Sequence, residues 1–248
     1  MGQVMIITGG GRGIGAATAR LAAARGYSIV VNYRRDGAAA QELVAELVAA
    51  GGQARAIAAD VSVERDVERL FAETDASLGR VDVLVNNAGI VDVMSRLSDM
   101  GQARLQRMFA VNVIGSMLCA REAVRRMSTR SGGSGGCIVN VSSAAARLGS
   151  PGSYVDYAAS KGAIDTFTLG LAQEVAAEGI RVNAVRPGII ETDIHADSGD
   201  RSRPSKMAHV VPIQRPGDPE EVARAILWLA GPEASYCTGS LLDVAGGR

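Results

Sequence analysis

Residues 4–15 read Val-Met-Ile-Ile-Thr-Gly-Gly-Gly-Arg-Gly-Ile-Gly, and this stretch decides the fold. Its four leading apolar residues predict a buried strand of a parallel sheet. The glycines predict a tight turn, and Ala16 to Arg25 has the composition of a helix that Gly26 closes. A strand, a glycine-rich turn and a helix in this order are typical of the first unit of an α/β nucleotide-binding fold.

The glycine-rich turn predicts a diphosphate site. Glycines let the backbone approach a ligand closely, and the free N–H groups at the start of a helix carry partial positive charge that attracts an anion. Such a turn can also be merely structural, but its place between the first strand and the first helix favours nucleotide binding. The candidate contacts in the turn are Gly9, Arg12, Gly13, Ile14 and Gly15.

Strand-like and helix-like segments alternate along the rest of the chain. Further strands are expected at 28–33, 54–58, 81–85, 137–141, 180–185 and 241–244, and helices at 36–50, 62–78, 100–127, about 157–177 and from 218. Ser62 is the expected cap of the third helix, and Asp218-Pro219-Glu220-Glu221 has the chemistry of a helix start. This alternation predicts an α/β Rossmann fold, a doubly wound seven-stranded parallel sheet with helices on both faces, as one domain over residues 1–248.

Composition excludes several classes of function. The chain has 26 basic and 26 acidic side chains, whereas nucleic-acid and membrane-surface binders usually carry a basic excess. Its three cysteines and two histidines show no metal-ligand spacing, so no metal site is expected. No signal segment or bilayer-spanning run is present. We therefore expect a cytoplasmic protein that acts on a small molecule. Residues 191–211, which hold both histidines, are predicted to form a substrate lid.

Tyr157 and Lys161 predict proton-transfer chemistry. They lie four residues apart in a segment of helix formers, so both occupy one helix face, whereas the partner at that spacing from Tyr154 is the uncharged Ala158. Bringing a phenol pKa from ~10 to about 7 requires roughly 4 kcal/mol of preferential stabilisation, of which a nearby ammonium supplies part. The alternative is an exposed Tyr beside a Lys on a solvated helix face.

The end of the second predicted strand indicates which dinucleotide is bound. Tyr33 is followed by Arg34 and Arg35. Proteins that bind NAD usually have an acidic residue at this strand end, which accepts a hydrogen bond from the ribose 2′-hydroxyl, and this chain has none there. We therefore expect NADP(H) rather than NAD(H), held mainly by Arg34, with Arg12 in the glycine turn as the second contact and Arg35 facing solvent. The alternative is that the arginine pair simply caps a strand. Asp60, with Val61, either accepts from the adenine amino group or opens a turn.

With these pieces placed, the chain resembles the short-chain dehydrogenase/reductase family from about Val4 to Gly247. Thr8-Gly9 with Gly13 and Gly15 is similar to the family's TGxxxGxG loop. Asn86-Asn87-Ala88-Gly89 resembles its NNAG motif. Pro187-Gly188 and Thr192 resemble its PGxxxT motif, which also contains Ile190. The family's catalytic tetrad matches Asn112, Ser143, Tyr157 and Lys161.

The resemblance implies a role for each matched residue. Tyr157 would transfer the proton, Ser143 would hold the substrate oxygen, and Lys161 would bind the nicotinamide ribose and lower the Tyr157 pKa. Asn112 would support a relay water, and Thr192 would hold the carboxamide end of the cofactor. One departure is the spacing of fourteen residues between Ser143 and Tyr157, one more than is usual, which fits an extra residue in the loop 149–152.

The resemblance also implies an NADP(H)-dependent oxidoreductase that interconverts a carbonyl and a secondary alcohol. Similar bacterial proteins include 3-oxoacyl-carrier-protein reductases and glucose 1-dehydrogenases. A homotetramer packed through the helices at 100–127 and 157–177 is expected. The alternative is a catalytically silent NADP-sensing or scaffold protein of the same fold.

Overall fold

A computed structural model describes residues 2–192 and 202–248, with the side chain of Arg203 left aside. Seven strands form one parallel sheet in the order β3-β2-β1-β4-β5-β6-β7. The predicted doubly wound parallel sheet is confirmed. The strands are β1 (Val4–Ile7), β2 (Ser28–Tyr33), β3 (Ala54–Ala58), β4 (Val81–Asn86), β5 (Gly136–Val141), β6 (Ile180–Pro187) and β7 (Leu241–Val244).

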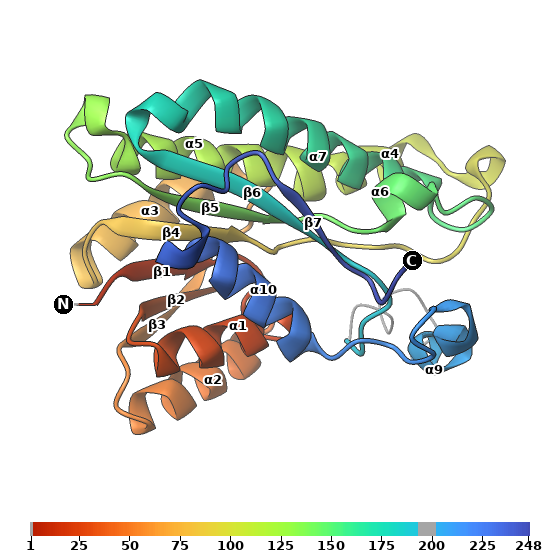
Figure 1. The fold of residues 1–248 in the computed structure, drawn as a ribbon, viewed down its shortest axis with the longest axis horizontal. Coiled ribbons are helices and arrows are strands. Elements are labelled where there is room, and N and C mark those ends of the chain that lie inside the picture. Colours follow the sequence, from red (N-terminus) through yellow and green to blue (C-terminus); the bar gives the residue numbers. More distant parts are fainter. Residues whose placement is uncertain (1, 193–201) are drawn as a thin grey trace.

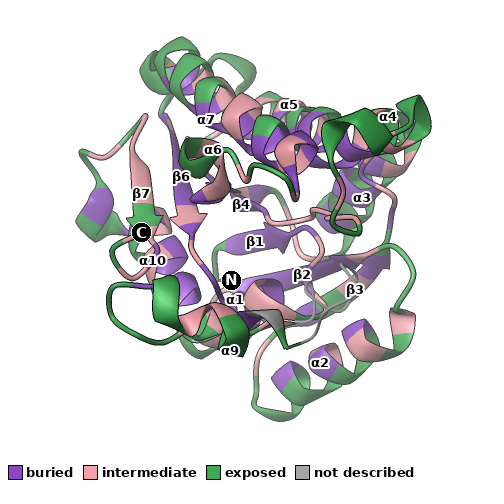
Figure 2. Ribbon diagram, turned by 90° about the vertical axis from the view of Figure 1, so that its right-hand side faces the viewer, coloured by how far each residue is buried: buried purple, intermediate pink, exposed green. Residues whose placement is uncertain are grey.

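The helices cover the sheet in two layers (Figures 1 and 2). One layer holds α1 (Gly13–Ala24), α2 (Gly37–Ala49) and α10 (Pro219–Ala230). The other holds α3 (Glu64–Ser77), α4 (Gln102–Phe109), α5 (Ser116–Met127), α6 (Ala145–Leu148) and α7 (Val155–Val175), while α9 (Arg203–Met207) lies apart from both. Each layer packs its own apolar cluster against the strands, so the central strands β1, β2, β4 and β5 are buried on both faces, whereas the edge strands β3 and β7 keep partly exposed side chains.

The α3 cap differs from the prediction. Ser62 does not cap the helix, because its hydroxyl donates to Asp60 Oδ1 at 2.6 Å, and Val63 holds the cap position. The Asp218 start is confirmed, since Asp218 and Glu221 form a reciprocal capping box with Pro219 in the first turn of α10.

The predicted continuous helix at 100–127 is helical but not uniform. Residues Ala110–Gly115 form a π-helix between α4 and α5, with the buried Asn112 inside it. π-Helical turns inside α-helices widen the backbone spiral and are frequent at functional sites. The described helices include none that is long and apolar enough to span a bilayer.

The predicted lid contains some regular structure. Residues 203–207 form α9 and Ala208–Val210 a 3-10 turn, in which His209 Nδ1 contacts the Lys206 carbonyl oxygen at 2.8 Å. His195 and the rest of 193–201 lie outside the described residues.

Candidate active site

The glycine-rich turn joins β1 to α1 at the carboxyl edge of the sheet, where open α/β sheets bind ligands. Gly9 and Gly13 have positive φ angles of 59° and 53°, which favour glycine. A Cβ on Gly9 would lie 3.0 Å from Ala88 Cα, and one on Gly15 would lie 2.7 Å from Asn87 Nδ2. The turn therefore needs glycine for its conformation and for its close packing.

The end of β4 holds the turn in place. Asn87 Nδ2 donates to the carbonyl oxygens of Thr8 and Gly9, both at 2.9 Å. The Thr8 hydroxyl in turn accepts from the backbone N–H groups of Asn87 and Ala88, both at 3.0 Å. The amide of Asn87 is therefore used to shape the turn.

Ser143 and Tyr157 meet at the carboxyl end of β5. The Ser143 hydroxyl lies close enough to the Tyr157 phenol to influence its pKa, and it accepts from the Ala145 N–H at 3.1 Å. Burial raises the pKa of Tyr157, and the Ser143 hydroxyl opposes that rise. The neighbouring Ser142 points elsewhere, since its hydroxyl donates to Asp165 Oδ1 at 2.6 Å.

Lys161 lies on the same face of α7 as Tyr157, as the spacing predicts. Its Nζ donates to the Val141 carbonyl oxygen at 2.7 Å and lies 5.6 Å from the centroid of the Tyr157 ring. Burial lowers the pKa of Lys161 to about 8, and the Asp165 carboxylate opposes that shift. The expected lowering of the Tyr157 pKa by Lys161 does not hold in this arrangement, because burial of the phenol outweighs the other influences on it.

Asn112 reaches the same place from the π-helix. Its Oδ1 accepts from the Ile90 N–H at 2.8 Å, and its Nδ2 donates to the Ile90 carbonyl oxygen at 3.0 Å and to the Ser160 hydroxyl at 3.1 Å. A Cβ added to Gly89 would lie 3.6 Å from both Asn112 Oδ1 and Lys161 Nζ. Asn112 and Lys161 thus lie beside the segment that follows β4, Tyr157 lies next to Lys161, and Ser143 lies next to Tyr157.

Arg34 and Asp60 form an ion pair at the ends of β2 and β3, with 2.7 Å between Nε and Oδ2. Asp60 Oδ1 also accepts from the backbone N–H and hydroxyl of Ser62, so the carboxylate does open a turn. The ring of Tyr33 lies over Gly37, where an added Cβ would be 3.1 Å from Cε2. Arg12 and Arg35 are exposed.

The remaining predicted cofactor residues line the same edge. The Gly188 N–H donates to Val244 O at 3.0 Å, and the Pro187 carbonyl oxygen accepts from the Ala144 N–H at 2.9 Å, beside Ser143. Thr192 approaches the glycine turn, because a Cβ on Gly13 would lie 3.3 Å from its Cγ2. Ile190 and Val61 are buried, and Ile14 is partly buried.

Sequence reasoning missed Asn32. This buried side chain accepts from the Gly9 N–H at 3.2 Å and donates to Ala59 O at 3.0 Å, so it joins the glycine turn to the end of β3. The sequence did contain a signal for this role, because Asn32 is a polar residue in the largely apolar strand β2. A buried amide is expected to be hydrogen-bonded, so its position indicated a structural contact.

The loop 149–152 departs from ordinary backbone geometry. Gly149, Ser150 and Gly152 have positive φ angles of 72°, 45° and 70°. The fourteen-residue spacing from Ser143 to Tyr157 is thus accommodated by α6 and three left-handed residues before α7 begins.

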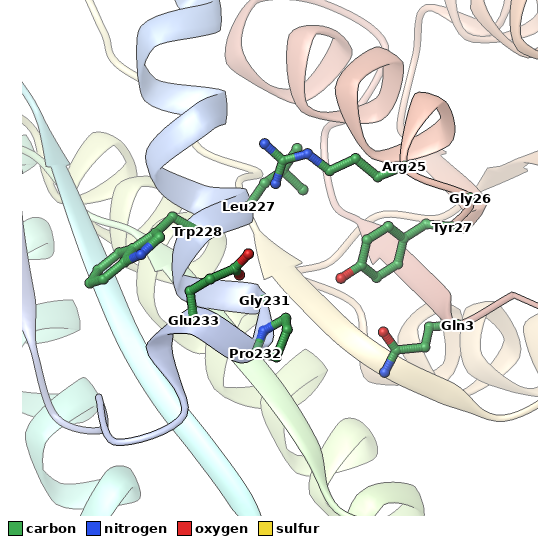
Figure 3. A pocket seen from close by; sticks show the side chains of 9 residues that line it. All are labelled: Gln3, Arg25, Gly26, Tyr27, Leu227, Trp228, Gly231, Pro232 and Glu233. Atoms are coloured by element: carbon green, nitrogen blue, oxygen red, sulfur yellow. The ribbon is translucent and has the colours of Figure 1, made fainter.

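A hollow of about 420 Å³ lies at the opposite edge of the sheet (Figure 3). Gln3, Arg25 and Tyr27 line one side, and Trp228 and Glu233 the other. These residues precede β1 and β2, lie near the end of α10, or belong to the 3-10 turn Pro232–Ala234 that follows it. The hollow is therefore separate from the Tyr157 site, which stands at the carboxyl ends of the strands.

Comparison with known proteins places these features in a wider group. A family model described as enoyl-(acyl carrier protein) reductase matches residues 9–248. The chain is 52% identical to the uncharacterized oxidoreductase YgfF of Escherichia coli K12, over 99% of each chain. It is 39% identical to the 3-oxoacyl-[acyl-carrier-protein] reductase of Synechocystis, over 99% of this chain and 96% of that protein.

A solved structure shows the same architecture. The blue fluorescent protein from a metagenomic library, crystallised in complex with NADPH, superposes with a TM-score of 0.90 at 36% sequence identity. The match covers 99% of this chain and 97% of that chain.

Proposed function

This chain belongs to the short-chain dehydrogenase/reductase family of NAD(P)-dependent oxidoreductases that act on CH–OH and C=O groups, and from that premise we propose NADP(H)-dependent interconversion of a carbonyl and a secondary alcohol. The observation that carries the proposal is the position of the Tyr157 phenol, next to the Ser143 hydroxyl and 5.6 Å, measured from the ring centroid, from the buried Nζ of Lys161. When bound, the cofactor supplies or takes up the hydride; the protein supplies the proton and the orientation.

The glycine turn fits a dinucleotide. The tight spaces above Gly9 and Gly15 allow no side chain, and the first N–H groups of α1 face the same edge. We assign the diphosphate to the turn, with Gly9, Gly13, Ile14 and Gly15, and we assign Arg12, in the same turn, as a second contact of the 2′-phosphate. We assign the nicotinamide side to the segments after β4 and β6, with Asn87, Ala88, Gly89, Pro187, Gly188, Ile190 and Thr192, together with Tyr157 and Lys161.

Tyr157 is the proposed proton donor. Its raised pKa keeps the phenol protonated at neutral pH, which is the form that can protonate the oxygen of a carbonyl being reduced. Ser143, already next to the phenol, would hold that oxygen. Lys161 is proposed to bind the nicotinamide ribose, and Asn112, held against Ile90 and Ser160, to support a relay water.

Arg34 is the proposed basis of NADP(H) preference. Asp60 holds its guanidinium at the end of β2, where a fold of this kind receives the adenosine ribose, with Tyr33 and Val61 alongside. A guanidinium there would form charge-assisted bonds with a 2′-phosphate. The NADPH bound in a structurally similar protein supports the assignment.

A turnover screen tests the function. Purified protein is supplied with NADPH and a panel of ketones, sugars and acyl thioesters, and absorbance at the reduced-nicotinamide band is followed. Steady consumption with at least one carbonyl compound is expected. Tight NADPH binding with no turnover across the panel would instead favour the silent sensing or scaffold protein.

We further propose a single-domain, cytoplasmic homotetramer in which residues 191–211 serve as a substrate lid. Exposed apolar side chains on the α4–α5 segment and on α7 support assembly through these helices: Phe109, Ile114, Met117 and Leu169.

A further inference from the structure

Arg104 and Asp156 form a buried ion pair next to Tyr157. Arg104 Nε lies 2.8 Å from Asp156 Oδ2, and its Nη2 donates to Oδ1 at 3.2 Å. The two side chains are only 12% and 0% exposed. Two parallel bonds between a guanidinium and a carboxylate give strong directional specificity, and burial protects them from solvent screening.

The third nitrogen of Arg104 holds a loop. Its Nη1 donates to the Val93 carbonyl oxygen at 2.7 Å. The backbone ties the same loop, residues 90–96, to the start of α7 through a bond from the Ser95 N–H to Ser153 O at 3.0 Å. Arg104 therefore joins three parts of the chain: α4, the loop 90–96 and the first turn of α7.

Asp156 is tied to the residue that carries the chemistry. Asp156 directly precedes Tyr157 in the first turn of α7. Burial alone would raise the pKa of its carboxylate, but the bonds from Arg104 and the nearby backbone N–H groups at the start of the helix hold that pKa below the ordinary range. The carboxylate is thus charged and fixed at the start of α7. Removing the pair would delete the side-chain link between the Val93 carbonyl oxygen and the residue that precedes Tyr157.

The loop presents apolar side chains beside this pair. Val93 and Met94 are 54% and 53% exposed although they are large and apolar. Exposed apolar side chains that lie next to each other can contact an apolar part of a ligand, because burying them removes apolar surface from water. A chain held rigidly by Arg104 and Ser153 would present them in one fixed position.

We propose that the Arg104–Asp156 pair is a positioning clamp that fixes Val93 and Met94 relative to Tyr157, so that the site selects carbonyl compounds with an apolar substituent. The inference rests on the proposed function, because it assumes that the reacting carbonyl lies at Tyr157. Arg104 and Asp156 are positioning residues and do not take part in proton transfer.

Two variants test the clamp. Arg104→Met combined with Asp156→Asn removes both charges, since deleting one partner alone would leave a buried, uncompensated charge. Arg104→Lys keeps the positive charge, but an ammonium cannot form two parallel bonds to the carboxylate and also bind the Val93 carbonyl oxygen. This single variant tests the clamp if the double variant does not fold. The matched control is Arg20→Met with Glu46→Gln, because that pair is also bidentate and joins two helices, α1 and α2, but is half-exposed and remote.

The first readout is amide hydrogen exchange of the loop. Exchange of the Ser95 N–H should accelerate at least tenfold in both clamp variants and stay unchanged in the control, with the NADPH dissociation constant within threefold of wild type in all. Unchanged Ser95 exchange in a folded clamp variant would overturn the proposal, whether or not the protein proves to be an enzyme.

The second readout is selectivity for ketone length. For 2-octanone, kcat/KM should fall at least tenfold in the clamp variants, and for 2-butanone, which has a much shorter apolar chain, less than threefold. Equal losses for the two ketones would show a general structural effect and contradict the clamp's role in selection. If the wild type reduces other members of the carbonyl panel but not 2-octanone, the substrate class is wrong while the proposed function stands.

Discussion

Lys161 donates from Nζ to the carbonyl oxygen of Val141, 2.7 Å away, at the end of the strand that leads to Ser143. This bond fixes the ammonium between β5 and the face of α7 that also carries Tyr157. The ammonium is buried there, and burial is the largest cause of its lowered pKa. At this proposed ribose-binding position, burial therefore destabilises the charged form of Lys161 relative to the neutral form.

That cost should appear in the pH dependence of stability. The pKa of Lys161 falls from 10.5 to about 8 on folding, so the folded state binds fewer protons between these values and stability rises as pH increases through this window. Relative to Lys161→Met, in which other titrations cancel, wild-type unfolding free energy should increase by about 3 kcal/mol from pH 7 to 10.5. Urea denaturation of both proteins measures the difference; a flat difference would mean that Lys161 titrates normally.

Tyr157→Phe should leave NADPH binding within about threefold and lower kcat by roughly 10²- to 10⁴-fold, because it removes the transferable proton and keeps the ring. Steady-state kinetics and cofactor titration measure the two effects. Tyr154→Phe is the matched control, one residue before α7, and should retain most activity. A wild-type rate in Tyr157→Phe, with loss in Tyr154→Phe, would reverse the assignment.

Arg34→Ala should weaken NADPH binding by about ten- to a hundredfold and change NADH binding little, since only NADPH offers a 2′-phosphate to the guanidinium. The variant also leaves Asp60 without its 2.7 Å partner, which adds repulsion toward that phosphate. Arg35→Ala, at an exposed neighbouring position, is the control and should have a small effect. Equal affinity of the unmodified protein for NADH and NADPH at fixed salt would overturn the assignment.

Light scattering at micromolar concentration should give a mass of about four chains of 25.6 kDa. Leu169→Glu, on the exposed face of α7, should lower that mass by placing a charge in the proposed interface. Val48→Glu, exposed on α2 in the other helix layer, should not. A monomer mass for the wild type contradicts the assembly.

The sequence by itself determined the architecture. The apolar runs predicted the positions of all seven strands to within two residues. The reason is clearest for the central strands, because a strand that helices cover on both faces must be largely apolar along its length. The start of α10 was also predictable from the sequence, because the capping residue Asp218, the proline and the glutamate that form it lie within one helical turn. The spacing of Tyr157 and Lys161 likewise placed both side chains on one helix face.

Tertiary structure alone decided what those side chains contact. Arg104 meets Asp156 across 52 residues, and Arg34 meets Asp60 across two strands, so neither pairing leaves a local pattern. Asn112 lies in a π-helix and forms long-range hydrogen bonds with the backbone of Ile90, which its local sequence does not indicate. Ser62 does not cap α3, because its hydroxyl bonds to Asp60 instead, and Val63 takes the cap position. The pKa values of Tyr157 and Lys161 depend on burial, and burial is set by the packing of α7 against the sheet rather than by the spacing of the two residues.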